Sequence, residues 1–445
     1  MQLPAPSHLP GAPGGLPERR LGSTPLRVPK PSAQVARAVW QALDSAAAAW
    51  RRRSSEERVR VLARSARQLR ARGPGRWGEA LQRSTGLSAA GLEAAWDTTF
   101  APHDRDSLLR ALREEALDET MLVAAAERQL LARRVLHVVA GNVLPATWIV
   151  LARGWLLGAA QWLRPAQREP LFAACLLADL AEIAPELAAC TALLWWPHAD
   201  AATSHAVVAG AHAVTVQGSD DGVAAWRHQV GRCKPAPLFI GYGSRWSGAL
   251  VTRAGQTRDS ARGAARDVAL FDQQGCLSPT LLFAERGAGL EKWCRRLAQE
   301  LADLERKMPR GHLGARARAA LRNWHETARL DQAVGDLQGF WAPERSIAWG
   351  VILLRRCAAY ESPLDRHVVV VPFSDPEEIV RGLGPHLERL QGLALAAPDW
   401  SAAKRQDVLD RLHPTRTAPV GSLQLAPLGW PQDHHPPLRS LIPGL

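Results

Sequence analysis

One cysteine, Cys276, stands in a part of the chain whose residue types suit covalent chemistry. It lies in the string Asp-Gln-Gln-Gly-Cys-Leu-Ser-Pro over residues 272–279, ahead of a strand pattern at 280–284. A thiolate presented on a loop can attack a thioester or an aldehyde, and the bound intermediate divides one difficult step into two. The alternative is a buried structural cysteine, the commoner fate of this residue type.

The residues around the cysteine indicate a break between two regular elements. A helical pattern begins at about Arg258, and we expect it to end at Gln273 and Gln274. Gly275 permits the turn that stops a helix, and Pro279 prevents the helix from resuming. The thiol is therefore expected at a turn.

A side-chain amide upstream could bind the oxyanion that such chemistry produces. Asn142 lies in Ala-Gly-Asn-Val-Leu-Pro, residues 140–145, directly after a predicted strand at 135–139. Ligands of open α/β sheets bind beyond the carboxyl ends of strands, which is where this amide would lie. The Cys276 backbone N–H would be a second donor. Asn142 could equally be an ordinary turn residue after Gly141.

Alternation of strand and helix patterns predicts the fold class. Strand patterns recur at 135–139, 160–163, 191–195, 213–216, 238–240, 280–284, 349–355, 367–371 and 393–396. Helical runs separate many of them, which implies right-handed crossovers and mostly parallel sheets. We therefore expect two doubly wound α/β lobes behind a helical N-terminal region. The expected domains are a Pro-rich, disordered arm at 1–34, a helical entry region with a nucleotide-binding α/β domain at 35–260, a catalytic α/β domain at 261–418 and a tail at 419–445.

Composition narrows the class of protein. The six cysteines have no framework spacing, which favours a reducing cytoplasm over an exported disulfide scaffold. The Pro- and Gly-rich start lacks the apolar core of a signal peptide. The apolar window 147–163 is short for a bilayer and contains Arg153, so we expect a buried helix and strand rather than a membrane span. The His434 and His435 pair has no partner at metal-ligand spacing, so no metal site is predicted.

Most of the net charge of +12 lies before residue 77, around a basic helix. Such a helix could meet nucleic acid, anionic lipid or an acidic carrier protein. A solvated helix face is the favoured interpretation, and no nucleic-acid partner is predicted, because aromatic interleaving and a recognised motif are missing.

The Cys276 segment resembles the nucleophile segment of acyl-CoA reductases of the bacterial bioluminescence type, the fatty acid reductases, a branch of the aldehyde dehydrogenase superfamily. Residues 140–145 are similar to the Gly-Asn-x-Pro signature of that superfamily, whose Asn binds the oxyanion. Residues 429–435 are similar to a Trp-x-x-Asp-Gly tail, with His434 replacing Gly. The resemblance covers roughly residues 135–441 and implies an aldehyde dehydrogenase-like fold.

The resemblance also implies cofactor-binding residues. Arg164 ends a strand that resembles one ending in Lys-Pro-Ser, where the Lys contacts the adenosine ribose or its 2'-phosphate. An Arg can fork onto a phosphate, which favours NADPH over NADH; the alternative is a surface Arg that closes a strand. Gly218 and Ser219 resemble the turn that covers the pyrophosphate, and Glu361 resembles the Glu that holds the nicotinamide ribose.

The segment at which hydrolytic aldehyde dehydrogenases place a general base has no carboxylate here, from Leu238 through Gly255. Without a base to activate water, passing an acyl group between a cysteine and coenzyme A is favoured over releasing an acid. The sequence thus predicts NADPH-dependent reduction of a fatty or related acyl-CoA, or acyl-carrier, thioester to an aldehyde. The alternatives are a non-catalytic acyl-carrier-docking protein of the same fold and an ordinary aldehyde dehydrogenase. An acyl-protein synthetase or transferase is a candidate partner, and a homo-oligomer is left open.

Overall fold

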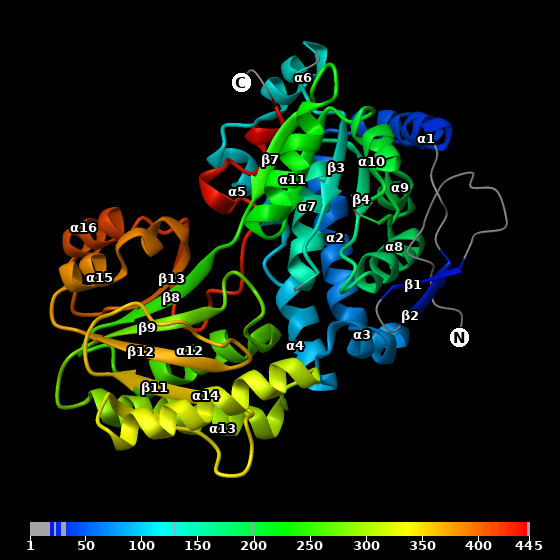
Figure 1. Cartoon of the computed structure of the whole chain (residues 1–445). Coiled ribbons are helices and arrows are strands. Elements are labelled where there is room, and N and C mark those ends of the chain that lie inside the picture. Colours follow the sequence, from blue (N-terminus) through cyan, green and yellow to red (C-terminus); the bar gives the residue numbers. More distant parts are fainter. Residues whose placement is uncertain are drawn as a thin grey trace. The chain divides into compact units, whose positions relative to one another are not determined.

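The computed structural model describes residues 18–21, 24–27, 33–128, 130–141, 143–197 and 199–442 of the chain (Figure 1). Contacts divide the chain into two compact units. Unit 1 comprises residues 1–85, 96–244 and 426–445, and unit 2 comprises residues 86–95 and 245–425. The junction at 244 and 245 precedes the boundary expected at 260, and the last residues belong to unit 1. The arm expected at 1–34 lies largely outside the described residues.

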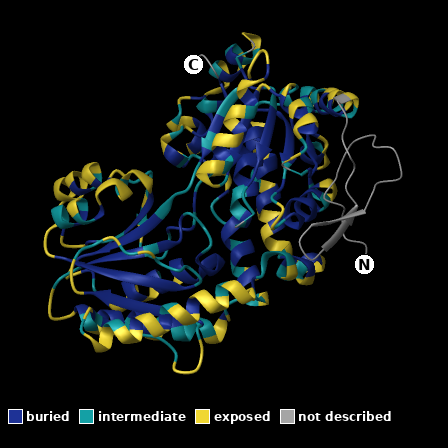
Figure 2. Ribbon diagram, in the orientation of Figure 1, coloured by how far each residue is buried: buried dark blue, intermediate teal, exposed yellow. Residues whose placement is uncertain are grey.

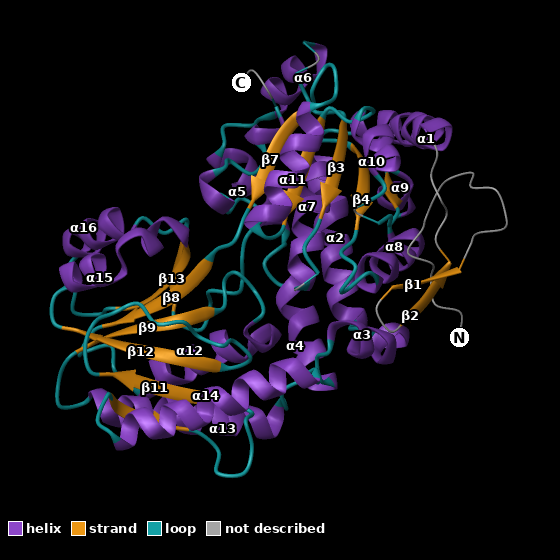
Figure 3. Ribbon diagram, in the orientation of Figure 1, coloured by secondary structure: helices purple, strands orange, loops and turns teal. Residues whose placement is uncertain are grey.

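Unit 1 holds a five-stranded parallel sheet in the order β5-β4-β3-β6-β7. Its strands are β3 (Arg134–Val138), β4 (Ala160–Arg164), β5 (Thr191–Leu193), β6 (Ala213–Gln217) and β7 (Leu238–Tyr242). Strands β3 to β6 are buried almost throughout, as expected for a parallel sheet covered by helices on both faces (Figures 2 and 3). A separate antiparallel pair is formed by β1 (Glu18–Leu21) and β2 (Thr24–Arg27).

Helices make up the rest of unit 1. They are α1 (Ala33–Arg51), α2 (Ser55–Arg72), η1 (Gly75–Trp77), α3 (Gly78–Thr85), α5 (Arg105–Glu114), α6 (Glu119–Glu127), α7 (Leu144–Leu156), α8 (Leu171–Ile183), α9 (Pro185–Ala189), α10 (Ala201–Val208), α11 (Asp220–Gly231), η4 (Gln432–His434) and η5 (Arg439–Leu441). Helix α4 (Ala89–Phe100) is divided between the units. Helix α7 and strand β4 form the buried helix and strand expected from the apolar window 147–163. No helix in the described part of the chain is long and apolar enough to cross a membrane.

The basic helix of the sequence is α2, and its arginines have diverse surroundings. Arg58 is buried and donates to the backbone oxygens of Arg51 and Arg53. Arg72 pairs with Glu182 on α8 at 2.8 Å. The helix begins with a capping box in which Ser54 and Glu57 bond reciprocally. Part of the positive charge therefore holds unit 1 together, rather than facing solvent alone.

The charged residue inside the apolar helix α7 has a structural explanation. Arg153 is 3% exposed. It donates to the backbone oxygens of Leu428 at 3.1 Å and Trp430 at 2.8 Å. A buried charge requires such partners. Arg153 thus anchors the C-terminal segment within unit 1.

Unit 2 holds a seven-stranded sheet in the order β10-β11-β12-β9-β8-β13-β14, parallel except for the pair β10 and β11. Its strands are β8 (Trp246–Val251), β9 (Pro279–Glu285), β10 (Leu337–Trp341), β11 (Gly350–Leu354), β12 (His367–Phe373), β13 (Leu390–Ala396) and β14 (Arg416–Pro419). Its helices are α12 (Arg258–Ala269), η2 (Leu270–Gln273), α13 (Leu290–Lys307), α14 (Ala315–Ala333), α15 (Pro376–Leu383), η3 (Gly384–Arg389) and α16 (Ala402–Leu412).

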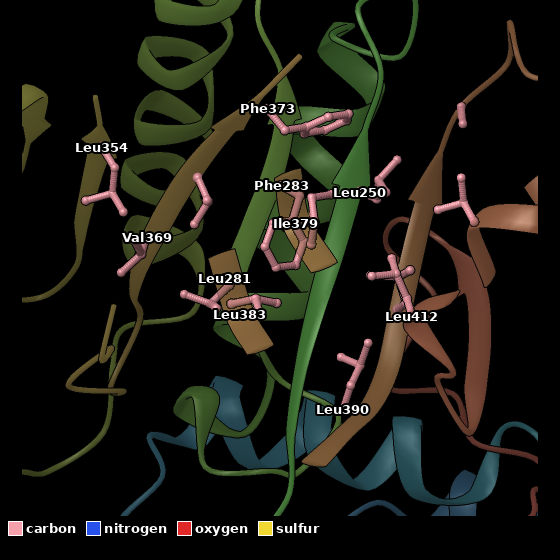
Figure 4. Packing of buried hydrophobic residues seen from close by; sticks show 14 of the residues in the cluster. Leu250, Leu281, Phe283, Leu354, Val369, Phe373, Ile379, Leu383, Leu390 and Leu412 are labelled. Carbon is pink, nitrogen blue, oxygen red and sulfur yellow. The ribbon is translucent and has the colours of Figure 1, made fainter. Parts of the chain in front are cut away.

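Side chains on one face of this sheet form the core of unit 2 (Figure 4). Leu281 and Phe283 of β9 contribute at every second position, as do Val369, Val371 and Phe373 of β12. This period of two is the one that directs strand side chains to a single face. Ile379 and Leu383 of α15 and Val408 and Leu412 of α16 complete the cluster.

The expected fold class of two parallel α/β units and the strand and helix alternation are confirmed, with additions and one correction. The sequence interpretation did not include the strands β8, β10 and β14 or the helix α14. The helix before Cys276 was expected to continue to Gln273 and Gln274, and this was wrong. Regular α12 ends at Ala269 because the next residues leave right-handed helical backbone, as described below.

Candidate active site

Cys276 lies on a short loop between η2 and β9, at the amino end of a central strand of the unit 2 sheet. The residue is half-buried and is not in a disulfide. The Ser278 N–H donates to the Gly275 oxygen at 2.9 Å, which closes a tight turn around the cysteine. The expectation of a cysteine in a turn at a helix end is therefore met in its local geometry.

The backbone before the cysteine adopts an unusual conformation. Three consecutive residues are left-handed: Phe271 (φ 55°), Asp272 (φ 49°) and Gln273 (φ 63°). Such a conformation is uncommon for residues other than Gly, Asn and Asp, and costs of order 1–3 kcal/mol for each residue. Surrounding contacts must therefore hold this segment in place.

Hydrogen bonds within the loop and from distant residues supply those contacts. The Ser247 hydroxyl, on β8, donates to the Cys276 carbonyl oxygen at 2.6 Å and accepts from the Gly392 N–H at 3.0 Å. The Gln273 side chain donates to the Pro279 oxygen at 2.8 Å, on the far side of the cysteine. The Gln424 side chain donates to the Ser278 hydroxyl at 2.7 Å. The loop is thus fixed on both sides of the thiol.

The other cysteines are poor candidates for a nucleophile. Burial raises the pKa of Cys190 to about 12 and that of Cys357 to about 11. Burial also raises the pKa of the thiols of Cys175, Cys233 and Cys294. A thiol that stays protonated at neutral pH neither attacks a carbonyl nor binds a metal efficiently. Among these six residues, Cys276 therefore has the best combination of loop position and exposure.

In unit 1, Arg164 ends β4 at the carboxyl edge of the parallel sheet. Its guanidinium carbon lies 5.3 Å from the ring centre of Trp196 and 5.7 Å from that of Trp226. One Nη donates to the Trp196 backbone oxygen at 2.8 Å. Burial lowers the pKa of Arg164 to about 10, so the side chain remains charged at neutral pH.

Buried polar atoms at this edge lack partners among the described residues. They are Nε of Arg164, Nε1 of Trp195 and Oε1 of Gln217. Arg164 ends β4, Gln217 ends β6, and Trp195 follows β5. Unpaired buried donors and acceptors are costly, and they are commonly satisfied by a ligand or by water. The residues present therefore fit a bound nucleotide.

Gly218 and Ser219 follow β6 at the same edge. A Cβ placed on Gly218 would meet nothing within 4 Å, so its backbone is open to a ligand. The Ser219 hydroxyl accepts the Gly222 N–H at 3.2 Å and caps α11. Asp220 accepts the Ser244 N–H at 2.8 Å, which ties this helix end to the residues after β7. The Ser219 side chain thus caps α11, and the Asp220 side chain bonds the Ser244 backbone.

Asn142 lies outside the described residues. The preceding Gly141 packs tightly, because a Cβ there would lie 2.7 Å from the Ala166 Cβ and 3.1 Å from the Glu169 nitrogen. Glu169 itself accepts the N–H groups of Leu171 and Phe172 at the start of α8. A glycine is therefore required at position 141, because Ala166 and Glu169 approach it too closely to leave room for a side chain.

Glu361 is exposed on the loop that precedes β12. The same loop reaches the nucleophile segment through its later residues, since Asp365 accepts from the Gln274 side chain at 2.8 Å. Glu361 and Cys276 thus belong to one unit, while Arg164, Gly218 and Ser219 belong to the other. No group of three or more metal-ligating residues occurs in the ranges that the structure describes.

The sequence of this chain matches the acyl-CoA reductase (LuxC) family over residues 54–443. The chain belongs to this acyl-CoA reductase family. Curated relatives include the long-chain acyl-protein thioester reductases of Vibrio harveyi and Aliivibrio fischeri, each 22% identical over 69% of this chain. The match spans 63% of the first relative and 62% of the second, so somewhat less than two thirds of their length.

Solved aldehyde dehydrogenase structures share the fold of this family member. A benzaldehyde dehydrogenase from Corynebacterium glutamicum superposes with a TM-score of 0.64 at 12% identity, covering 91% of this chain and 90% of that one. Aldehyde dehydrogenase 21 from Physcomitrella patens gives a TM-score of 0.64 at 15% identity, covering 90% and 85%. At such identities the likeness concerns the fold alone.

Several residues of the site were not singled out from the sequence. Arg366 and Asp272 form a buried ion pair beside the nucleophile loop, and Ser247 holds the cysteine carbonyl. Trp196 and Trp226 flank Arg164. The available signal was a charged residue, Arg366, directly before the apolar strand pattern at 367–371.

Proposed function

We propose that this protein reduces a long-chain acyl thioester to an aldehyde with NADPH, through an acyl thioester on Cys276. The single observation that carries the proposal is the half-buried turn that presents Cys276, which is fixed on both sides by hydrogen bonds from Ser247, Gln273 and Gln424. Family membership supports it, as do the curated relatives, which are long-chain acyl-protein thioester reductases.

In the proposed reaction the Cys276 thiolate attacks the thioester carbonyl and expels the donor thiol, so the acyl group passes from one sulfur to another. Asn142 and the Cys276 backbone N–H donate to the oxyanion. Arg164, Gly218 and Ser219 hold NADPH, which would supply the hydride, with Glu361 at the nicotinamide ribose. The reduced adduct, an oxyanion, then collapses: its carbon–sulfur bond breaks as the carbonyl re-forms, and aldehyde and the Cys276 thiolate are released.

The absence of a carboxylate between Leu238 and Gly255 supports reduction over acid formation. A hydrolytic enzyme needs a base to activate water at the acyl-enzyme stage. In this chain the acyl group on Cys276 would instead persist until hydride arrives. The donor thiol belongs either to coenzyme A or to an acylated protein, and the relatives' names favour the protein-bound donor.

The test uses the full chain with NADPH and a panel of saturated acyl-CoA thioesters, with an acylated carrier protein as a second donor. Aldehyde formation is followed by mass spectrometry together with NADPH consumption. We expect aldehyde from the wild type, none from Cys276→Ala, and an acyl adduct on the Cys276 peptide when NADPH is omitted.

Cys357→Ser is the matched control, since Cys357 is the other half-buried cysteine of unit 2. It should retain wild-type activity. A Cys276→Ala variant with full activity would refute the proposal. Binding of NADPH without turnover of either donor would favour the non-catalytic docking protein instead.

A further inference from the structure

We propose that Asp272 and Arg366 are positioning residues for the nucleophile, which hold the turn before Cys276 in the conformation that presents its thiol. The inference rests on the role proposed above for Cys276. It concerns how the chain maintains a backbone that its own residue types disfavour.

Two left-handed turns lie side by side in unit 2. The first is the run 271–273 before β9, and the second is Leu364 (φ 66°), Asp365 (φ 55°) and Arg366 (φ 69°) directly before β12. Strands β9 and β12 are parallel neighbours, with Leu281 paired to Val369. Both turns therefore lie at the amino edge of the same pair of strands.

Consecutive side chains join the two turns. Nε of Arg366 donates to Oδ1 of Asp272 at 2.8 Å, and Nη2 of Arg366 forms an ion pair with the same oxygen at 2.6 Å. The Gln273 side chain accepts the His367 N–H at 2.8 Å and donates to the His367 oxygen at 2.9 Å. Gln274 donates to Asp365 at 2.8 Å. Each residue from 272 to 274 thus bonds to the opposite turn or to the first residue of β12 after it.

Both members of the Asp272–Arg366 ion pair also form hydrogen bonds with residues outside the two turns. The Arg366 side chain is 2% exposed, and its Nη1 donates to Glu305 at 2.9 Å and to the Met308 oxygen at 2.8 Å. The second oxygen of Asp272 accepts the Gly311 N–H at 2.9 Å. Asp272 therefore has its orientation set from two directions, by Arg366 and by the segment after α13.

This arrangement bears on the cysteine because left-handed backbone is strained for Phe271 and Gln273. Without the ion pair, the segment would relax toward ordinary backbone angles, and residues a few positions later would move with it. Displacing a reacting group by about 1 Å can cost on the order of a hundredfold in rate. The pair thus acts on Cys276 through the backbone, not by touching the substrate.

The experiment compares Asp272→Asn, Asp272→Glu, Arg366→Lys and Gln274→Ala in the full chain. The first readout is the rate at which iodoacetamide alkylates Cys276 as a function of pH, followed on the Cys276 peptide by mass spectrometry. The second is kcat and KM for the acyl thioester. Arg411→Lys is the control, because Arg411 forms an exposed ion pair with Glu377 in the same unit.

We expect Asp272→Asn and Arg366→Lys to lower kcat by about tenfold to a hundredfold, with KM changed by less than about threefold. Alkylation should slow by at least about fivefold, because the relaxed loop presents the thiol for less of the time. Asp272→Glu restores the carboxylate and should recover part of the loss, Gln274→Ala should have a smaller effect, and Arg411→Lys none.

Wild-type alkylation rates and kcat in folded Asp272→Asn and Arg366→Lys would overturn the inference. If both variants fail to fold, Gln274→Ala decides, and a wild-type alkylation rate and kcat in this variant would equally overturn the inference. Alkylation needs no substrate. If the wild type reduces no thioester, the proposed function fails while the alkylation series still tests the positioning role.

Discussion

A pair of buried imidazoles in unit 2 predicts a steep loss of stability on mild acidification. Nε2 of His325, on α14, lies 2.9 Å from Nε2 of His367, and the two residues are 1% and 0% exposed. Nδ1 of His367 lies 3.0 Å from the Leu364 oxygen and 2.9 Å from the Asp365 oxygen, so this nitrogen carries a proton. Its Nε2 then accepts from His325. A further proton on Nε2 of His367 would set two donors against each other, and a further proton on Nδ1 of His325 would place a charge on a buried ring.

The magnitude follows from the pKa values. Burial lowers the pKa of His325 to about 4 and, with the neighbouring imidazole, that of His367 to about 3, both from 6.5. Arg310 and Arg329 add to the effect on His325. Because the folded pKa values lie below the unfolded one, the unfolded chain binds more protons. Stability is complete above about pH 6.5 and falls as the pH drops toward 4. At about pH 5 each imidazole contributes a loss of about 2 kcal/mol, or about 4 kcal/mol for the pair.

The assay is urea unfolding of the wild type and of His325→Leu at about pH 7.5 and about pH 5, followed by circular dichroism. The variant loses a hydrogen bond and should be less stable at the higher pH. Its further loss on acidification should be smaller than that of the wild type by about 2 kcal/mol, since one titrating group is gone. His386→Gln, which removes an exposed imidazole, should leave the pH dependence unchanged. Equal losses in the wild type and His325→Leu would refute the reasoning.

Three further predictions concern the site and the core. Arg164→Gln should raise KM for NADPH about tenfold or more and change KM for NADH less than about threefold, since a charge-assisted bond contributes about 1.5–3 kcal/mol; steady-state kinetics with both cofactors would test it. Asn142→Ala should lower kcat on the order of a hundredfold through loss of an oxyanion donor, with KM for the thioester nearly unchanged, measured by aldehyde formation. Phe283→Ala removes a fully buried ring from the unit 2 core and should reduce the free energy of unfolding by about 3–5 kcal/mol, measured by urea unfolding.

Local patterns were sufficient for most strands and helices. Buried parallel strands such as β12 are continuous apolar runs, His-Val-Val-Val-Val in this case, and their length and flanks distinguish them from helices. Strand β8 was missed because its sequence, Trp-Ser-Gly-Ala-Leu-Val, has Ser and Gly at its second and third positions, which interrupts the apolar run. Its second residue, Ser247, is buried and bonds the Cys276 carbonyl, so its polarity has a tertiary cause.

The nucleophile itself could be predicted from residue types, but the residues that hold it could not. Cys276 is bonded by Ser247, 29 residues earlier, and the Asp272 beside it by Arg366, 94 residues later. No local propensity predicts left-handed backbone at Phe271, because an isolated chain would avoid it. The conformation exists only because contacts formed on folding outweigh the local preference.

The tertiary contacts that hold the strained turn also connect stability with the proposed chemistry. Gln273 bonds the backbone of His367, and His367 contacts His325, so the acid-sensitive imidazole pair is hydrogen-bonded to the strained turn before the nucleophile. Protonating the pair would loosen the amino end of β12, where Arg366 is held. Activity should therefore fall over the same pH range as stability. The turn before Cys276 should lose its conformation before the unit 2 core unfolds, because a strained segment has a lower local free energy of opening than the core.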